Sequence, residues 1–488
     1  MTHPSHRASL LENAHTDLFI DGSFDPATGQ ATFDVVNPAD AEVLCAVADA
    51  TPADGMRALE AAAAAQSDFA ATSAVERHQM LLTAYRLMME RQDDLALLMT
   101  LEMGKPVAES AGEIAYAAEF FRHYAAEALR GGGGYQPTPQ GGARFILARQ
   151  PVGPCLLITP WNFPMAMGTR KIGPALAAGC ACVIKPAQQT PLSMLALAGI
   201  LREAGVPDGV VNVIPTSDSG GVMEPMITSG LARKLSFTGS TKVGKVLLKQ
   251  SADKVLRTSM ELGGNAPFLV FDDADLDEAV AGCMQAKMRN MGEACTAANR
   301  IYVQSGVHDA FVEKLTEQMS QLKVGDGTLD DSTVGPLIDS SARDDVHALV
   351  SEALQGGARL HTGGTMPEGS GYFYPPTVLT DVPADARITA EEIFGPVAAV
   401  ISFETEDEAV AAANDTEFGL VAYAYTNDLR RGLRVAERIE AGMVGLNQGV
   451  VSNAYAPFGG IKESGLGREG GAEGIEEYLE TKYIGVTM

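Results

Sequence analysis

The fold is decided by a pattern repeated over residues 155–250, which reads CLLITP (155–160), CACVIKP (180–186), VVNVIP (210–215) and RKLSFTGS (233–240). Each of these apolar runs is followed by a segment with helical periodicity. Strands that alternate with helices in this way predict a parallel sheet covered by helices. Ligands of such sheets bind beyond the carboxyl ends of the strands, so we expect the functional residues in loops that follow strands.

A second α/β series runs from Ala266 to about Val444, and helical periodicity covers residues 51 to about 130. The glycine-rich run GGGGYQPTPQGG connects units, while the extended run ARFILARQPVG after it and the last residues of the chain are typical of interface elements. We therefore expect three parts. These are an α/β unit from residues 1–130 and 152–263, a second α/β unit from residues 264–463, and a small β element from residues 131–151 and 464–488.

Composition excludes several classes of protein. The chain has 488 residues, enough for two or three packed units, and a net charge of −26, which argues against nucleic acid as a partner. We see no secretory signal and no apolar run of the roughly 20 residues that a bilayer needs. Six cysteines without a CxxC motif predict free thiols in a reducing cytoplasm, and no metal site is expected.

The segment KMRNMGEACTAANR (287–300) places Cys295 among small and polar residues, after a glycine-containing bend and before a strand-like run that starts at Ile301. A thiolate there could attack a carbonyl, although a lone cysteine is more often a small buried hydrophobe. In LSFTGSTKVGK (235–245), a strand, a glycine turn and a helix start aim backbone N–H groups at a phosphate. Val246 replaces the Ser or Thr of a triphosphate loop and GxGxxG is absent, so a dinucleotide would bind through Ser240 and the helix start. A plain strand-to-helix turn is the alternative.

Two further motifs hold groups that could assist a nucleophile. MELGGNAP contains Glu261, which is a general base if burial raises its pKa and a solvated surface acid otherwise. TPWNFP contains Asn162, whose amide could donate to an oxyanion or could simply stabilise a turn between two prolines.

Together these motifs resemble the aldehyde dehydrogenase superfamily. The resemblance spans nearly the whole chain and is most like the succinate-semialdehyde dehydrogenases. It rests on the segments TPWNFPMAMGTRKIGPALAAGCACVIKPAQQTP (159–191), FTGSTKVGK (237–245), MELGGNAPFLVFDDADLD (260–277), GEACTAANR (292–300), EEIFGPV (391–397), NDTEFGL (414–420) and PFGGIKESGLGRE (457–469). It implies an α/β fold with a Rossmann-like cofactor domain in the first unit, a catalytic domain in the second and an oligomerisation element in the third.

By this resemblance, Cys295 is the nucleophile that forms a thiohemiacetal and then a thioester, and Glu261 activates the water that hydrolyses it. Asn162, with the Cys295 backbone N–H, would form the oxyanion hole, and Glu469 matches a second acid with a proton-relay role. The residues implied in cofactor binding are Trp161, Lys185, Gln188, Ser240, Glu392 and Phe394.

The cofactor expected from the resemblance is NADP, with NAD possible as the alternative. Members that favour NAD commonly carry Glu where this chain has Gln188, and loss of that carboxylate removes repulsion of a 2′-phosphate that Lys185 could then bind. The expected substrate is a small aldehyde with a distal carboxylate, most of all succinate semialdehyde. The residues implied in binding it are Phe163, Arg170, Arg289, Ser452 and Phe458. The alternative for Arg170 is a surface or interdomain ion pair.

Two departures from the family pattern limit which family properties the resemblance implies for this chain. Ala297 stands where some semialdehyde dehydrogenases have a second cysteine, so no local disulfide switch is expected. Glu293 stands where Gln is commoner, and a carboxylate near Cys295 would raise the thiol pKa. The expected protein is a cytoplasmic homodimer or homotetramer without nucleic acid or membrane partners. The alternatives are a dehydrogenase for glutarate semialdehyde or broad aliphatic aldehydes, and a catalytically silent binding protein on this fold.

Overall fold

The computed structural model describes residues 4–383 and 385–487, and it confirms the predicted α/β class. Its larger sheet has the order β2-β1-β9-β8-β7-β10-β11-β21, in which the five strands from β9 to β11 are parallel. The strands are β1 (Leu18–Ile20), β2 (Ser23–Asp25), β7 (Cys155–Ile158), β8 (Cys182–Lys185), β9 (Val211–Val213), β10 (Lys234–Thr238), β11 (Arg257–Glu261) and β21 (Gly465–Leu466).

Helices cover both faces of this sheet because its strands are apolar on both sides. Cys155 and Leu157 of β7 belong to one buried cluster, whereas Leu156 and Ile158 belong to another, as the alternation of side chains along a strand requires. The first cluster is completed by α3 (Ala74–Glu90), α4 (Gln92–Met103), α5 (Val107–Ala128), α6 (Ala166–Ala178) and α7 (Leu192–Glu203). The second is completed by α2 (Pro52–Ala71), α8 (Ser219–Thr228) and α9 (Thr241–Ala252).

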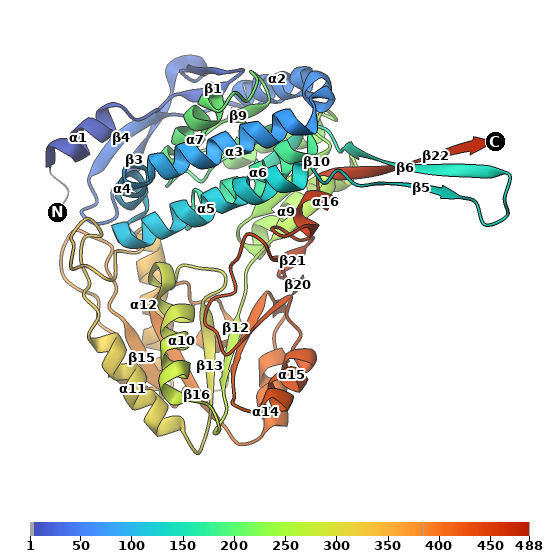
Figure 1. The fold of residues 1–488 in the computed structure, drawn as a ribbon. Coiled ribbons are helices and arrows are strands. Elements are labelled where there is room, and N and C mark those ends of the chain that lie inside the picture. The colour runs from blue at the N-terminus through green and yellow to red at the C-terminus, as the bar shows by residue number, and fades with distance from the viewer. Residues whose placement is uncertain (1–3, 384, 488) are drawn as a thin grey trace.

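The second sheet has the order β14-β15-β16-β13-β12-β18-β19, and all its neighbours except β14 and β15 run parallel. Its strands are β12 (Ala266–Val270), β13 (Ala298–Gln304), β14 (Arg359–Thr362), β15 (Thr377–Thr380), β16 (Val397–Phe403), β18 (Val421–Tyr425) and β19 (Met443–Leu446). Its helices are α10 (Leu276–Met288), α11 (His308–Ser320), α12 (Ser340–Gln355), α13 (Arg387–Ala390), α14 (Glu406–Asn414) and α15 (Leu429–Arg438). It forms the lower lobe in Figure 1.

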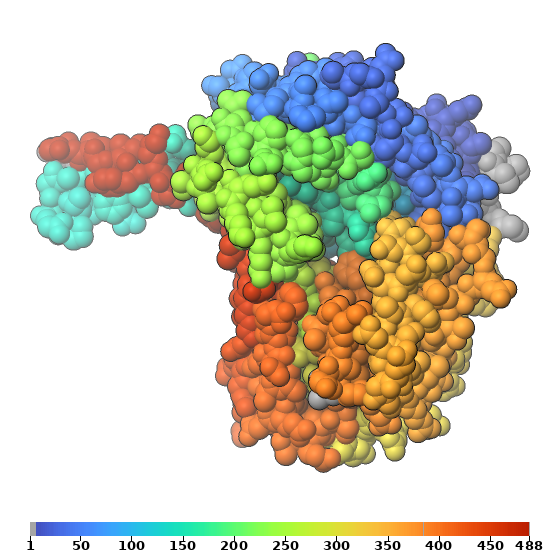
Figure 2. Space-filling view, turned by 180° about the vertical axis from the view of Figure 1, so that it is seen from behind, coloured from blue at the N-terminus to red at the C-terminus, as the bar shows by residue number. Residues whose placement is uncertain are grey.

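A three-stranded antiparallel arm extends from the body (Figures 1 and 2). It joins β5 (Gly133–Pro137) and β6 (Ala143–Pro151) to the C-terminal β22 (Leu479–Thr487). The tetraglycine run, predicted to be only a connection, enters β5 at Gly133. The remaining elements are α1 (Pro4–Glu12), β3 (Thr32–Val36), β4 (Val43–Ala48), β17 (Phe418–Gly419), β20 (Ile461–Lys462) and α16 (Glu473–Glu476). No helix in the described part of the chain is both long and apolar enough to cross a membrane.

The order of the first sheet predicts where a ligand binds. From β7 the chain builds outward to β8 and β9, then returns to the other side of β7 to build β10 and β11. The loops after β7 and β10 therefore separate at their carboxyl ends and leave a crevice between them. Figure 2 shows the molecule hollowed between the two lobes.

Candidate active site

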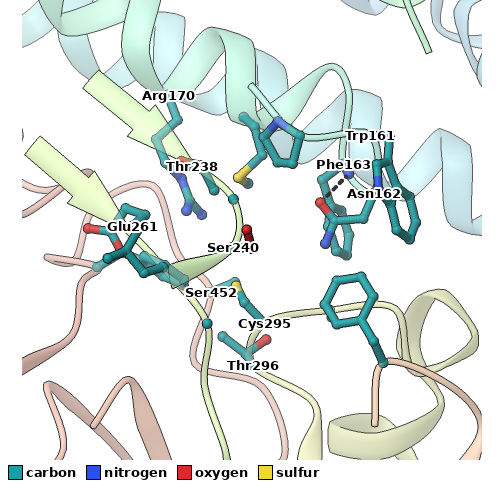
Figure 3. A pocket seen from close by; sticks show the side chains of 18 of the residues that line it. Trp161, Asn162, Phe163, Arg170, Thr238, Ser240, Glu261, Cys295, Thr296 and Ser452 are labelled. Carbon is teal, nitrogen blue, oxygen red and sulfur yellow. Dashed lines mark hydrogen bonds between the residues drawn. The ribbon is translucent and has the colours of Figure 1, made fainter. Parts of the chain in front are cut away.

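A cavity of about 260 Å³ lies between the lobes and gathers residues from both sheets. Twelve of the fifteen predicted site residues line it, from loops that are far apart in the sequence (Figure 3). They are Trp161, Asn162, Phe163, Arg170, Ser240, Glu261, Arg289, Cys295, Glu392, Phe394, Ser452 and Phe458. The other three, Lys185, Gln188 and Glu469, lie outside the lining.

Cys295 is presented by a turn of unusual backbone conformation. Asn290, Met291 and Gly292 all have left-handed φ values, of 53°, 54° and 78°. A side chain at Gly292 would overlap the carbonyl oxygen of Gly395, so glycine is required there for packing as well as for conformation. Cys295 precedes β13, as its predicted place before the strand-like run from Ile301 requires, and it is therefore an exception to the general expectation that site residues follow strands. In the site, the amino end of β13 from the lower sheet therefore faces the carboxyl ends of the strands of the upper sheet.

The surroundings of Cys295 favour its neutral thiol over the thiolate. Burial, and secondarily the Glu392 carboxyl, raises the pKa of Cys295 to about 12, so the resting group is a neutral thiol. Glu293 is not responsible, because its carboxyl points elsewhere and its Oε1 accepts a 3.0 Å hydrogen bond from the backbone N–H of Ile338. Burial also raises the pKa of Glu293 well above its usual range.

Asn162 and Glu261 lie on opposite sides of Cys295 in Figure 3. The Asn162 Nδ2 donates to the backbone oxygen of Glu293, 2.9 Å away, which fixes the amide beside the nucleophile loop. An amide nitrogen carries two hydrogens, so this contact leaves one available to a ligand. The alternative role for Asn162, as a turn stabiliser, is also met in part, because its Oδ1 accepts from the N–H of Phe163.

Glu261 ends β11 and is buried, which rules out the alternative of a solvated surface acid. Neither of its carboxyl oxygens has a hydrogen-bond partner. Burial, reinforced by the nearby Glu469 carboxylate, raises the pKa of Glu261 well above its usual range. A carboxyl with a raised pKa takes up and releases its proton closer to neutral pH than an ordinary Glu does, which suits general base catalysis.

Glu469 lies behind Glu261 and not in the cavity wall. Its Oε1 accepts a 2.5 Å hydrogen bond from Lys171 Nζ, and its backbone pairs with that of Phe458. Both Glu469 and Lys171 are buried.

The residues around β10 fit a dinucleotide. Ser240 caps α9, its Oγ accepting from the N–H of Val243 at 3.4 Å, so the first turn of a 12-residue helix opens onto the crevice. Thr238 offers a buried hydroxyl without a partner, and Glu392 accepts from the N–H of Gly264 at 3.4 Å. Phosphate and ribose hydroxyls need this combination of N–H donors, hydroxyls and a carboxyl acceptor.

Four further residues were predicted to bind the cofactor, and two of them, Trp161 and Phe394, line the cavity. Lys185 is buried at the end of β8 and donates to Ser219 Oγ at 3.0 Å, and burial lowers the pKa of Lys185 to about 8. Gln188 is exposed and lies three residues after that strand ends. Trp161 and Phe394 meet edge to face, with ring centroids 5.4 Å apart.

Two arginines and several aromatic rings also line the cavity. Arg170 Nη2 donates to the hydroxyl of Tyr116 at 2.5 Å, and Arg289 Nη1 donates to Ser452 Oγ at 3.1 Å. The Arg170 guanidinium lies 4.0 Å from the ring centroid of Phe458, and its Nε and Nη1 have no hydrogen-bond partner. The ion pair expected as the alternative for Arg170 is also present, since its Nη1 is 3.7 Å from Glu469 Oε2.

Several lining residues were not predicted. Tyr116 approaches from α5 and lies near both arginine side chains, with guanidinium carbons 5.8 Å from its ring centroid. Nothing local in the helical sequence around Tyr116 distinguishes it from a packing residue. Thr238 and Thr296 lie within or beside motifs already recognised, so their neighbours were the available signal. The others are Pro160, Met167, Gly239, Leu262, Gly263 and Ala294.

Comparisons with known proteins agree with this geometry. The family model described as aldehyde dehydrogenase family matches residues 24–484. A succinate-semialdehyde dehydrogenase of Paenarthrobacter nicotinovorans is 56% identical over 91% of this chain and 99% of its own. A glutarate-semialdehyde dehydrogenase of Pseudomonas putida is 50% identical over 96% of this chain and 97% of its own. The crystal structure of an NADP-dependent enzyme of E. coli superposes with a TM-score of 0.96 at 50% identity, covering 99% of each chain.

Proposed function

The chain belongs to the aldehyde dehydrogenase family, and on that premise we propose that it oxidises succinate semialdehyde to succinate with NADP as the preferred hydride acceptor. One observation carries the choice of substrate. Arg170 and Arg289 both line the cavity that contains Cys295. A guanidinium pairs with a carboxylate through two parallel hydrogen bonds, so this cavity suits an aldehyde whose far end is charged.

The first stage is oxidation at Cys295. The thiol loses its proton to water, the sulfur forms a bond to the aldehyde carbon, and the carbonyl oxygen becomes an oxyanion held by Asn162 Nδ2 and the Cys295 N–H. Hydride then leaves that carbon and a thioester remains. Because burial opposes the thiolate, cationic groups that face the sulfur favour its formation. Arg170 and Arg289 both act in this direction on the pKa of Cys295.

The second stage is hydrolysis of the thioester. Glu261 takes a proton from water, the water oxygen attacks the thioester carbon, and the carbon–sulfur bond breaks to release the acid. The same oxyanion donors serve both stages. Glu469 and Lys171 tune how readily Glu261 binds and releases its proton, because Glu469 raises the pKa of Glu261 whereas Lys171 lowers it.

The cofactor supplies the hydride acceptor when it is bound. Ser240 and the start of α9 would hold its pyrophosphate, and Glu392 would accept from ribose hydroxyls. Preference for NADP is supported by Gln188, which adds no negative charge beside Lys185, and by the description of the E. coli structure as NADP dependent. NAD is the second candidate.

A kinetic comparison of two cofactors and two aldehydes tests the proposal. We expect kcat/KM to be higher with NADP than with NAD, and higher with succinate semialdehyde than with butanal, which has the same length but no carboxylate. Arg289→Ala should lower kcat/KM for succinate semialdehyde about 10- to 100-fold more than for butanal, because both aldehydes lose the effect of Arg289 on the Cys295 pKa and only the carboxylated one loses a charged hydrogen bond. A tenfold preference for NAD refutes the cofactor assignment, and equal losses on both aldehydes refute the role of Arg289.

Two other functions remain as competing proposals. Glutarate semialdehyde is one carbon longer, and the named P. putida relative favours including it in the substrate panel. A silent binding protein would produce no NAD(P)H with any aldehyde, but the joint presence of Cys295, Glu261 and Asn162 in one cavity supports an enzyme.

The remaining parts of the proposal concern the whole protein. We propose a cofactor domain of residues 1–130 and 152–263, a catalytic domain of residues 264–463, and an oligomerisation element of residues 131–151 and 464–488. The strands of the two large sheets and of the arm support this division, although β21 pairs with β11 of the first sheet. A homodimer or homotetramer in a reducing cytoplasm is supported by the protruding arm and by six unpaired cysteines.

A further inference from the structure

A buried ion pair lies on the far side of the oxyanion donor. Lys105 Nζ and Glu113 Oε2 are 2.5 Å apart, and each side chain is 1% exposed. Lys105 lies two residues after the end of α4, and Glu113 lies in the second turn of α5. Burying two charges is costly unless their remaining hydrogen-bonding groups are also satisfied, so the other contacts of this pair indicate what it does.

Those contacts converge on the loop that carries Asn162. Lys105 Nζ donates to the backbone oxygen of Asn162 at 2.7 Å and lies 4.2 Å from the ring centroid of Phe163. Glu113 Oε1 accepts from the backbone N–H groups of Met165 and Ala166, at 3.0 and 3.1 Å. The pair therefore binds the backbone of this loop at two points, one at the oxyanion donor and one at the start of α6.

A third contact joins this loop to the nucleophile turn. Asn290 Nδ2 donates to the backbone oxygens of Asn162, at 3.0 Å, and of Glu293, at 2.9 Å. The Asn162 side chain donates to the same Glu293 oxygen. Lys105, Asn162 and Glu293 are thus linked through consecutive hydrogen bonds, and the last of them is two residues from Cys295.

We propose that Lys105 and Glu113 are positioning residues that set the distance between the Asn162 amide and Cys295. Preorganised donors stabilise an oxyanion only when they already point at the place where its charge develops, so a small displacement of Asn162 slows both stages of the reaction. The proposal rests on aldehyde oxidation at Cys295 and is independent of which aldehyde is the natural substrate. Every kinetic test therefore uses whichever aldehyde the unaltered enzyme turns over fastest.

A competing role for Lys105 is direct substrate binding. Lys105 and Glu113 also border a neighbouring cavity of about 570 Å³ that shares Tyr116, Arg289 and Ser452 with the active site. A lysine that bound a substrate carboxylate would change KM for carboxylated aldehydes, whereas one that positions Asn162 changes kcat for every aldehyde.

The test is a double-mutant cycle on single-turnover rates. Lys105→Met should slow thioester formation 10- to 100-fold, with KM within twofold of the unaltered enzyme for charged and uncharged aldehydes alike. Because the effect passes through Asn162, Lys105→Met should slow an Asn162→Ala enzyme by less than twofold further. Quenching of the single tryptophan, Trp161, on titration with NADPH reports whether the variants still form the cofactor crevice.

Lys234→Met is the matched control, because Lys234 is also a buried lysine, with Glu477 3.5 Å away, but contacts none of the cavity residues. It should leave single-turnover rates within twofold. If Lys105→Met does not fold, Glu113→Gln replaces it in the cycle, since it keeps an acceptor for the Met165 and Ala166 N–H groups. Additive losses in the Asn162→Ala background, or a rise in KM for carboxylated aldehydes only, would overturn the proposal.

Discussion

Cys295 and Glu261 share an apolar cavity in which burial raises the pKa of both groups. For the thiol, burial is the largest cause and the neighbouring carboxyls of Glu392 and Glu261 add to it. For Glu261, burial is again the largest cause, followed by Glu469. In such a site the neutral forms of the nucleophile and the base are favoured by burial. Each group ionises when a nearby positive charge or a rise in pH offsets the cost of burying its charged form.

At the residue scale, Glu261→Gln should separate the two stages. Loss of the base slows thioester hydrolysis about 100-fold or more while leaving thioester formation largely intact. Stopped-flow measurement of NADPH should then show a burst equal to the number of active sites followed by a slow steady state.

The pH dependence of that step follows from the raised pKa of Glu261. A carboxyl whose pKa is raised holds its proton to a higher pH than an ordinary Glu does, so the fraction of active base, and with it the hydrolysis rate, should increase as the pH rises through that raised pKa. The Gln variant should lose this increase. A variant that keeps the same pH profile, or shows no burst, would contradict the assignment of Glu261 as base.

At the scale of elements, the turn over 289–292 connects the packing of the lower sheet to the chemistry of the site. Gly292→Ala should lower the free energy of unfolding by more than about 2 kcal/mol, because the new methyl group meets the Gly395 carbonyl and the left-handed backbone disfavours a side chain. Activity should fall as well, because Cys295 lies three residues further on. Denaturant unfolding and initial rates measure both effects.

Gly306→Ala is the matched control for that substitution. Gly306 follows β13, a side chain there would have no heavy atom within 4 Å, and its backbone is not in the left-handed region. Its unfolding free energy should stay within about 0.5 kcal/mol, as at surface sites free of special features. Equal effects of the two substitutions would show that the Gly395 contact does not restrict residue 292.

At the scale of the whole molecule, the arm exposes an apolar row that the isolated chain leaves uncovered. Tyr135, Ile146 and Ile484 are direct cross-strand neighbours and are 65%, 37% and 41% exposed. We expect another copy of the chain to cover this row, so Ile146→Asp with Ile484→Asp should reduce the mass measured by light scattering toward that of one chain.

Leu429→Asp is the control for the arm variant. Leu429 is 69% exposed and begins α15, on the lower lobe and away from the arm. Its substitution should leave the mass unchanged. If the arm variant also keeps the full mass, the subunit contact lies elsewhere.

The sequence predicted most of the site but not its arrangement. The alternation of strands and helices fixed the fold class, and the motifs around Cys295, Glu261 and Asn162 identified residues that do share a cavity. The prediction that Cys295 precedes a strand is confirmed by β13, although Cys295 is thereby an exception to the general expectation that functional residues follow strands. Tyr116 was missed because a tyrosine on an amphipathic helix is ordinarily core, and only the packing of α5 against α6 brings it to the arginines.

What the sequence determined by itself is the chemistry available: a thiol, a carboxyl, an amide and arginines within recognisable local patterns. Local patterns arise from backbone preferences and side-chain periodicity, which act over a few residues and are therefore visible along the chain. The tertiary structure alone decided the raised pKa values of Cys295 and Glu261 and the orientation of Glu293 toward Ile338. It also decided the hydrogen bonds of Lys105 and Glu113 to the Asn162 loop. These depend on burial and on contacts between residues up to hundreds of positions apart, and no local pattern records them.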